Sequence, residues 1–163
     1  MNTKKKNKFF QKKGFSLIEL IISIAILAIV SSVGFINIIN YKNRQTLVSN
    51  AREIVTILRN AQDRSLSQEG GSRWGVYFEN PVEGVGFFEL FQGSSYSSNA
   101  VSLKSSLASS VQFDIPLAGS SSTVVFSPVT GLPDKVLDIE ISLIGKPSVS
   151  STISVNSAGK ISF

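Results

Sequence analysis

The hydrophobic and polar positions divide the chain into three consecutive patterns. The first, residues 15–39, reads FSLIELIISIAILAIVSSVGFINII, and its only charged side chain is Glu19. A helix of roughly 20 apolar residues is long enough to cross a bilayer, so the pattern predicts a transmembrane helix over residues 15–40. No proline precedes Pro81, so no proline interrupts this helix.

The helical pattern continues after residue 40 but becomes one-sided. Apolar side chains recur at spacings of four, three, four and three, at Leu47, Ala51, Ile54, Leu58 and Ala61. Most of the charged side chains in this stretch lie on the other faces of the helix, which predicts an amphipathic helix over residues 41–70. Gly70 and Gly71 are expected to end it. A coiled-coil dimer is the alternative interpretation of the stripe, although the heptads do not persist.

Beyond residue 71 the apolar positions follow the period of two that is typical of strands. The predicted strands are residues 74–79, 86–91, 111–115, 123–126, 136–143, 152–155 and a short last piece at 161–163. The strand at 136–143 alternates most clearly, and its core-facing side chains are Leu137, Ile139, Ile141 and Leu143. A sheet of such strands has an apolar face that the amphipathic helix can cover. We therefore expect an α+β fold in which residues 71–163 form an antiparallel β-rich head packed on the second half of a long N-terminal helix.

The positive charge is concentrated at the N-terminus. The 163 residues carry a formal net charge of +5, but six lysines precede Gly14, namely Lys4, Lys5, Lys6, Lys8, Lys12 and Lys13. Without these six, 10 Lys and Arg (16 − 6) stand against 11 Asp and Glu. A basic run beside an apolar segment indicates a cytoplasmic anchor under the positive-inside rule. A solvated basic tail is the alternative.

The composition excludes several kinds of active site. The chain has no cysteine and no histidine, which rules out a disulfide, a thiol nucleophile and a Ser-His-Asp triad. Asp138 and Glu140 form an alternating acidic pair, for which a solvated strand face is the simpler interpretation. The sequence Gly84-Val85-Gly86 lacks the third glycine of a phosphate-binding loop. We therefore predict neither an enzyme nor a bound cofactor or metal.

Glu19 is the anomaly in the apolar segment. A carboxylate within a membrane helix costs about 2.5–3.5 kcal/mol, and more if it is unpaired. The nearest lysines lie on the other side of Gly14. A cut after Gly14 would create a free α-amine on Phe15, four residues from Glu19, which could neutralise the Glu19 carboxylate of its own chain or of a neighbour. If the neighbour provides the amine, assembly removes the penalty.

The apolar segment has three other interpretations. A general secretory signal peptide could be cut near Ser32-Val33-Gly34, but an acid near the start of its apolar region fits poorly. The segment could instead be a buried core helix of a soluble protein, but the apolar run is too long and too uniformly apolar for that. A plain uncleaved membrane anchor stays open.

The sequence Lys12-Lys13-Gly14-Phe15-Ser16-Leu17-Ile18-Glu19-Leu20 resembles the class III signal of type IV prepilins and pseudopilins. That family has a basic leader ending in Gly, then Phe, a Glu four residues on, and an apolar stretch. The resemblance implies that residues 1–14 are a leader, that prepilin peptidase cuts after Gly14 and N-methylates Phe15, and that Glu19 pairs with the Phe15 amine of an adjacent subunit. It also implies a single-pass inner-membrane location before assembly and an extracellular or periplasmic filament afterwards.

Later patterns resemble the GspH/FimT-like branch of minor pilins and pseudopilins. They are Ala51-Arg52-Glu53 with Leu58-Arg59 and Ala61, residues 124–128 followed by Gly131, and residues 153–155 followed by Gly159. The resemblance implies a structural subunit of a type IV pilus or a type II secretion pseudopilus. Its partners would be other pilins, prepilin peptidase and the inner membrane, with no small-molecule substrate.

Two alternative functions stay open, a DNA-binding minor pilin that assists DNA uptake and a simple membrane-anchored head. From Tyr41 onward, 10 basic residues stand against 10 acidic ones without a basic cluster. Phosphate contacts need clustered Lys and Arg, so DNA is not the expected partner.

Overall fold

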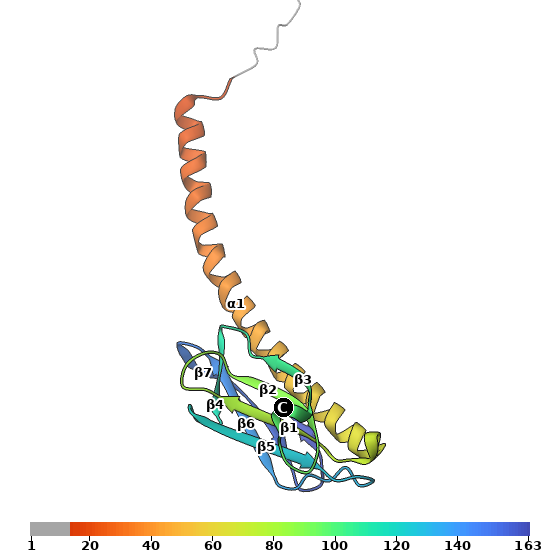
Figure 1. Cartoon of the computed structure of the whole chain (residues 1–163). Helices are drawn as coiled ribbons and strands as arrows, with labels where there is room; N and C mark the ends of the chain where they lie inside the picture. Colours follow the sequence, from red (N-terminus) through yellow and green to blue (C-terminus); the bar gives the residue numbers. More distant parts are fainter. Residues whose placement is uncertain (1–13) are drawn as a thin grey trace, which may run out of the picture. The chain divides into compact units, whose positions relative to one another are not determined.

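The computed structural model describes residues 14–163, apart from the side chains of residues 32–40. Helix α1 spans Leu17–Leu66, and a short 3-10 helix follows at Glu69–Gly71. The chain divides into two compact units, Met1–Ile39 and Asn40–Phe163. The second unit contains the last part of α1 and all eight strands of the described chain (Figure 1).

The strands of the second unit form two four-stranded sheets whose neighbouring strands are all antiparallel. The first sheet has the order β3-β2-β1-β5, with bounds β1 Trp74–Asn80, β2 Phe87–Gln92, β3 Val101–Ser106 and β5 Ser120–Phe126. The second has the order β4-β6-β7-β8, with bounds β4 Val111–Ile115, β6 Leu137–Leu143, β7 Lys146–Val155 and β8 Ile161–Ser162. A second 3-10 helix, Ser98–Ala100, precedes β3.

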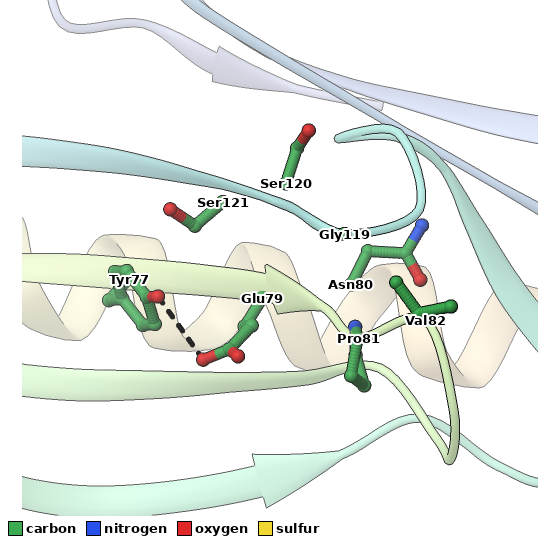
Figure 2. Close-up of a pocket in the computed structure, with 8 residues that line it drawn as sticks. All are labelled: Tyr77, Glu79, Asn80, Pro81, Val82, Gly119, Ser120 and Ser121. Atoms are coloured by element: carbon green, nitrogen blue, oxygen red, sulfur yellow. Dashed lines mark hydrogen bonds between the residues drawn. The ribbon is translucent and has the colours of Figure 1, made fainter.

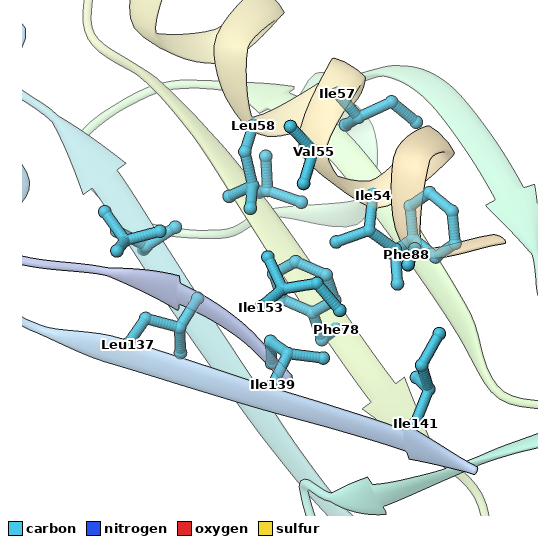
Figure 3. Packing of buried hydrophobic residues seen from close by; sticks show 14 of the residues in the cluster. Ile54, Val55, Ile57, Leu58, Phe78, Phe88, Leu137, Ile139, Ile141 and Ile153 are labelled. Atoms are coloured by element: carbon cyan, nitrogen blue, oxygen red, sulfur yellow. The ribbon is translucent and has the colours of Figure 1, made fainter. Parts of the chain in front are cut away.

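The apolar stripe of α1 and the inner faces of both sheets form one hydrophobic core. The stripe residues are at most 3% exposed, at Leu47, Ala51, Ile54, Leu58 and Ala61. Figure 3 shows Ile54 and Leu58 above Phe78 of β1, with Ile139 of β6 and Ile153 of β7 in the same cluster. Removing this part of α1 would expose both sheets at once, so the head and the amphipathic half of the helix stabilise each other.

The end of α1 differs slightly from the prediction. The helix ends at Leu66, whereas Gly70 and Gly71 lie in the following 3-10 helix with φ of 67° and 65°. The backbone amide of Trp74 donates a 2.8 Å hydrogen bond to Ser65 Oγ. The chain therefore returns to the last turn of α1 within nine residues and begins β1 there.

The predicted antiparallel sheet is present as two sheets, and three strand predictions need correction. Strand β3 was not predicted, because its sequence VSLKSS has little apolar alternation and its side chains are largely exposed. Strand β5 begins at Ser120 rather than residue 123, and β7 begins at Lys146 rather than residue 152. These serine-rich stretches resemble loops by composition, but backbone pairing with β1 and β6 makes them strands.

By hydropathy, none of the helical stretches in the described part of the chain is long and apolar enough to cross a membrane. The predicted leader up to residue 13, including Lys12 and Lys13, lies outside the described residues. The side chains of residues 32–40, at the end of the predicted membrane segment, lie outside them as well.

Candidate functional site

The predicted processing and assembly residues lie where α1 begins. Gly14 and Phe15 precede the helix, and the Phe15 side chain is 79% exposed. In the part of the chain that the structure describes, no neighbouring heavy atom lies within 4 Å of the position that a Cβ on Gly14 would occupy. The Gly14–Phe15 peptide bond is therefore outside the helix and uncovered by the described part of the chain.

Glu19 lies in the first turn of α1. The Ser16 carbonyl accepts hydrogen bonds from the backbone amides of Glu19 and Leu20, at 3.1 and 3.2 Å. Ser16 and Glu19 thus have the spacing of a capping box, and a carboxylate in the first turn lies favourably near the positive end of the helix dipole. Among the described residues, no side chain forms an ion pair with the Glu19 carboxylate. The helix end therefore favours the ionised form of this carboxylate, and the predicted pairing with an amine would add to that effect.

The first turns of α1 expose apolar side chains on every side. Eleven large apolar side chains between residues 15 and 30 are at least 53% exposed. The hydroxyls of Ser23 and Ser31 donate 2.7 Å hydrogen bonds to the carbonyls of Glu19 and Leu27. Apolar surface of this extent requires lipid or other helices to cover it, and the bonded hydroxyls suit such surroundings because they need no water.

A second polar cluster, which the sequence pattern does not predict, lies on the outer face of the first sheet. Glu89 of β2 is only 5% exposed, and its Oε1 lies 2.8 Å from Lys104 Nζ of β3. Its Oε2 accepts a 2.5 Å hydrogen bond from the Tyr96 hydroxyl. The Tyr96 ring stacks on Tyr77 with centroids 3.8 Å apart and makes a T-shaped contact with the Phe91 ring. Tyr96 therefore fastens the β2–β3 connection over the sheet.

The tyrosines of this cluster remain protonated at neutral pH. The hydrogen bond to Glu89, followed by burial, raises the pKa of Tyr96 to about 12. Burial is the largest cause that raises the pKa of Tyr77, whose hydroxyl also donates a 3.1 Å hydrogen bond to Glu79. A general acid or base works best with a pKa near the operating pH. These phenols are therefore structural donors.

A cavity of about 340 Å³ adjoins the cluster at the ends of β1 and β5 (Figure 2). Asn80, in its wall, donates hydrogen bonds to the carbonyls of Phe113 and Pro116, at 3.1 and 2.8 Å. The Asn80 amide thus holds the β4–β5 connection in place. The Glu79 carboxylate is likewise engaged, since it accepts the hydrogen bond from the Tyr77 hydroxyl. Residues 14–163, as far as their side chains are described, contain no group of acidic residues that could hold a metal ion.

Asp138 and Glu140 lie on the outer face of β6, opposite Ser154 and Thr152 of β7. Asp138 is exposed and Glu140 half-buried, while Leu137 and Ile139 face the core. This is the solvated strand face that the alternation predicts.

Comparison with known proteins gives a sequence match at the N-terminus and structural matches for the fold. Residues 10–35 match the family model described as the prokaryotic N-terminal methylation motif. Crystal structures of the type IV minor pilin FimU from Pseudomonas aeruginosa strain PAO1, in two crystal forms, resemble the chain with TM-scores of 0.55 and 0.59 at 18% identity. The alignments cover 71% and 76% of this chain and 90% and 91% of FimU.

The chain has the type IV pilin fold.

In this pilin fold, the predicted arrangement of helix and antiparallel strands is confirmed. The methylation motif spans Gly14, Phe15 and Glu19 together with much of the exposed apolar helix. The individual roles of these three residues stay predictions. No curated protein sequence matches the chain significantly.

The outer cluster of the pilin head was missed because its members meet only through strand register. The available signal was Glu89 within the otherwise apolar sequence FFELF of β2. An acid at the centre of a buried strand requires a partner. The register places Lys104 of β3 and Tyr77 of β1 on either side of it.

Proposed function

We propose that the protein is a structural subunit, of the minor pilin or pseudopilin kind, of a type IV pilus-like filament or a type II secretion pseudopilus. The observation that carries this proposal is the exposed apolar start of α1, at least 53% exposed at all eleven large side chains, in a chain whose head buries its own core. Such a helix needs an apolar partner, and the methylation motif and pilin fold favour packing among subunits.

The chain first enters the inner membrane through residues 15–40. The leader, with Lys12 and Lys13 at its end, stays on the cytoplasmic side because basic residues resist translocation. Prepilin peptidase then cuts the peptide bond between Gly14 and Phe15 and N-methylates the new amine. The exposed, non-helical position of this bond supports that step.

Assembly then pairs Glu19 with the Phe15 amine of an adjacent subunit. A cation at a helix N-terminus is destabilised by the helix dipole, and a carboxylate in an apolar environment is destabilised by the loss of water. Pairing the two removes both costs, and the gain is greatest where no water competes. Bundling of the apolar helices provides that dry environment and buries the exposed side chains of residues 15–30.

No observation in the head favours DNA binding. Arg64 Nη1 lies 3.3 Å from Glu69 Oε1, and its guanidinium lies 4.6 Å from the centre of the Trp74 ring. Lys104 is likewise paired with Glu89. These basic groups are engaged within the head, while phosphate binding needs clustered Lys and Arg directed to solvent.

Sheared surface filaments test the proposal. Mass spectrometry of purified filaments should find this chain at low abundance beside a major subunit, beginning at methylated Phe15. An unrelated inner-membrane protein, absent from the same preparation, serves as the control for membrane carry-over. A simple anchored head predicts a chain that stays in the membrane fraction, and a mature N-terminus at any other residue would contradict the processing step.

A further inference from the structure

One end of the head exposes apolar side chains around a shared cleft. Val82 is 80% exposed, Leu117 72%, Ile144 57% and Val85 45%, and all four line one cleft of about 500 Å³. They come from the β1–β2, β4–β5 and β6–β7 connections. Three connections that are distant in sequence thus contribute large apolar side chains to the same surface.

This cleft lies at the end of the head where α1 enters it. The last residue of β6, Leu143, and the first of β7, Lys146, enclose the turn that contains Ile144, and they line a smaller hollow together with Asn43 and Arg44 of α1. The Ile144 amide donates a 3.0 Å hydrogen bond to the Ser110 carbonyl. Nearby, the Ala108 amide donates a 3.0 Å hydrogen bond to Asn50 Oδ1 of α1. The apolar connections therefore border the part of the helix that directly follows residue 40.

The first exposed residues of α1 at this end are aromatic and basic. Tyr41 is 70% exposed, and Lys42 and Arg44 are exposed as well. Aromatic and basic side chains at the end of a membrane helix lie at the level of the lipid headgroups. Glu83 and Asp114 add negative charge around the cleft. Contact by the apolar side chains, rather than by charge, must therefore provide most of any attraction to a lipid surface.

We propose that, before assembly, this end of the head rests on the lipid surface from which α1 emerges, with Val82, Val85, Leu117 and Ile144 in the headgroup region. The inference rests on the proposed function in that residues 15–40 hold the chain in a bilayer. This tether keeps the cleft next to lipid at high effective concentration, so that a weak apolar contact is sufficient. A second copy of the chain is not tethered next to the cleft before assembly, so it does not have this effective concentration.

Single-cysteine labelling tests the contact, because the chain contains no cysteine of its own. The full chain with Leu117→Cys carries an environment-sensitive fluorophore and is reconstituted in vesicles of phosphatidylethanolamine and phosphatidylglycerol. The matched control is Val129→Cys, 66% exposed in the β5–β6 connection. This connection lies at the other end of the head, since the Cβ position of Gly131 is 2.9 Å from Leu66 Cγ.

The expected result is that nitroxide-labelled lipids quench the fluorophore at residue 117 several-fold more strongly than at residue 129. Adding Val82→Asp and Ile144→Asp to the Leu117→Cys chain should abolish the difference, with circular dichroism confirming that the head is still folded. A label at residue 117 that stays as water-accessible as the control, on a chain that floats with the vesicles, would overturn this proposal alone.

Two other outcomes also count against it. Protection of residue 117 only in assembled filaments would make the cleft a subunit contact and overturn the lipid assignment. A chain that fails to float with the vesicles would overturn both the lipid contact and the membrane insertion in the proposed function.

Discussion

The side-chain amide of Gln62 in α1 donates a 2.9 Å hydrogen bond to the carbonyl of Gly159, 97 residues further along the chain. The same nitrogen donates a 2.9 Å hydrogen bond to the carbonyl of Gly131. Gly159 has φ of 76°, and a Cβ there would lie 2.9 Å from Gln62 Nε2. One amide thus ties the β5–β6 and β7–β8 connections to the helix. The two late glycine patterns in the sequence therefore share one physical cause.

Gln62→Glu should destabilise the head. The substitution keeps the shape of the side chain but replaces its donor with a carboxylate that faces two carbonyl oxygens. We expect the free energy of unfolding to fall by about 3 kcal/mol, since unpaired buried groups cost about 1–3 kcal/mol each and charged ones more. Urea unfolding followed by Trp74 fluorescence measures the change.

The control is Gln45→Glu, which introduces the same charge at an exposed position of α1. It should leave the unfolding midpoint nearly unchanged. Equal effects of the two substitutions would show that the Gln62 hydrogen bonds contribute little.

Stability should fall in alkali in a way that depends on Tyr96. The pKa of Tyr96 is raised from 10.0 to about 12, chiefly by its hydrogen bond to Glu89, so the unfolded chain loses this proton first. The stabilisation from the hydrogen bond is therefore complete below pH 10 and is lost as the pH rises towards 12. Tyr96→Phe should lower stability at pH 8 and show a smaller further loss between pH 10 and 12.

Urea midpoints at several pH values separate this effect from general alkaline unfolding. Tyr41→Phe is the matched control, because Tyr41 is 70% exposed on α1. Its pH profile should follow that of the unsubstituted chain. If Tyr96→Phe also follows that profile, the Tyr96–Glu89 hydrogen bond is not the source of the alkaline sensitivity.

Glu19→Ala should separate processing from assembly. The substitution leaves the proposed cut site at Gly14–Phe15 intact, so the mature chain should still appear in membranes. Its incorporation into filaments should fall roughly tenfold or more, since about 1.4 kcal/mol of lost pairing corresponds to a factor of ten. The ratio of chain in sheared filaments to chain in membranes gives the result.

Asp63→Ala, which removes an exposed carboxylate from the same helix, is the control for Glu19→Ala. It should incorporate normally. Normal incorporation of the Glu19→Ala chain would exclude the proposed pairing with the Phe15 amine.

Gly14→Asp should block removal of the leader without disturbing the chain itself. Among residues 14–163, no heavy atom lies within 4 Å of the Cβ position of the new side chain, so we expect the described fold to be unaffected and the loss to arise at the peptidase. Immunoblots should show a precursor that keeps residues 1–14 and is absent from filaments. Cleavage at the normal rate would contradict the assignment of the cut site.

The sequence predicts those parts of the fold in which one element's own pattern decides its structure. The side chains of Leu137, Ile139 and Ile141 alternate because β6 has one solvated face, and all three are buried. The same holds for the apolar stripe of α1. Strand β3 and the first residues of β5 and β7 could not be predicted, because partner strands rather than their own side chains make them extended.

The candidate sites follow the same division. Gly14, Phe15 and Glu19 form a local motif that can be recognised in the sequence because its members lie within six positions of one another. The Glu89 cluster depends on the pairing of three strands and on a loop residue, Tyr96, that returns over them. Such residues are distant in sequence and meet only in the folded structure.

The serines of the apolar helix have a consequence for the proposed transfer of the chain from membrane to filament. Because Ser23 and Ser31 already donate to carbonyls one turn earlier, neither hydroxyl must exchange partners when the surroundings change. The outer surface of the helix is then equally apolar whether fatty acyl chains or neighbouring protein cover it. In the proposed transfer from lipid to a filament core, these two hydroxyls therefore need not be hydrated at any step.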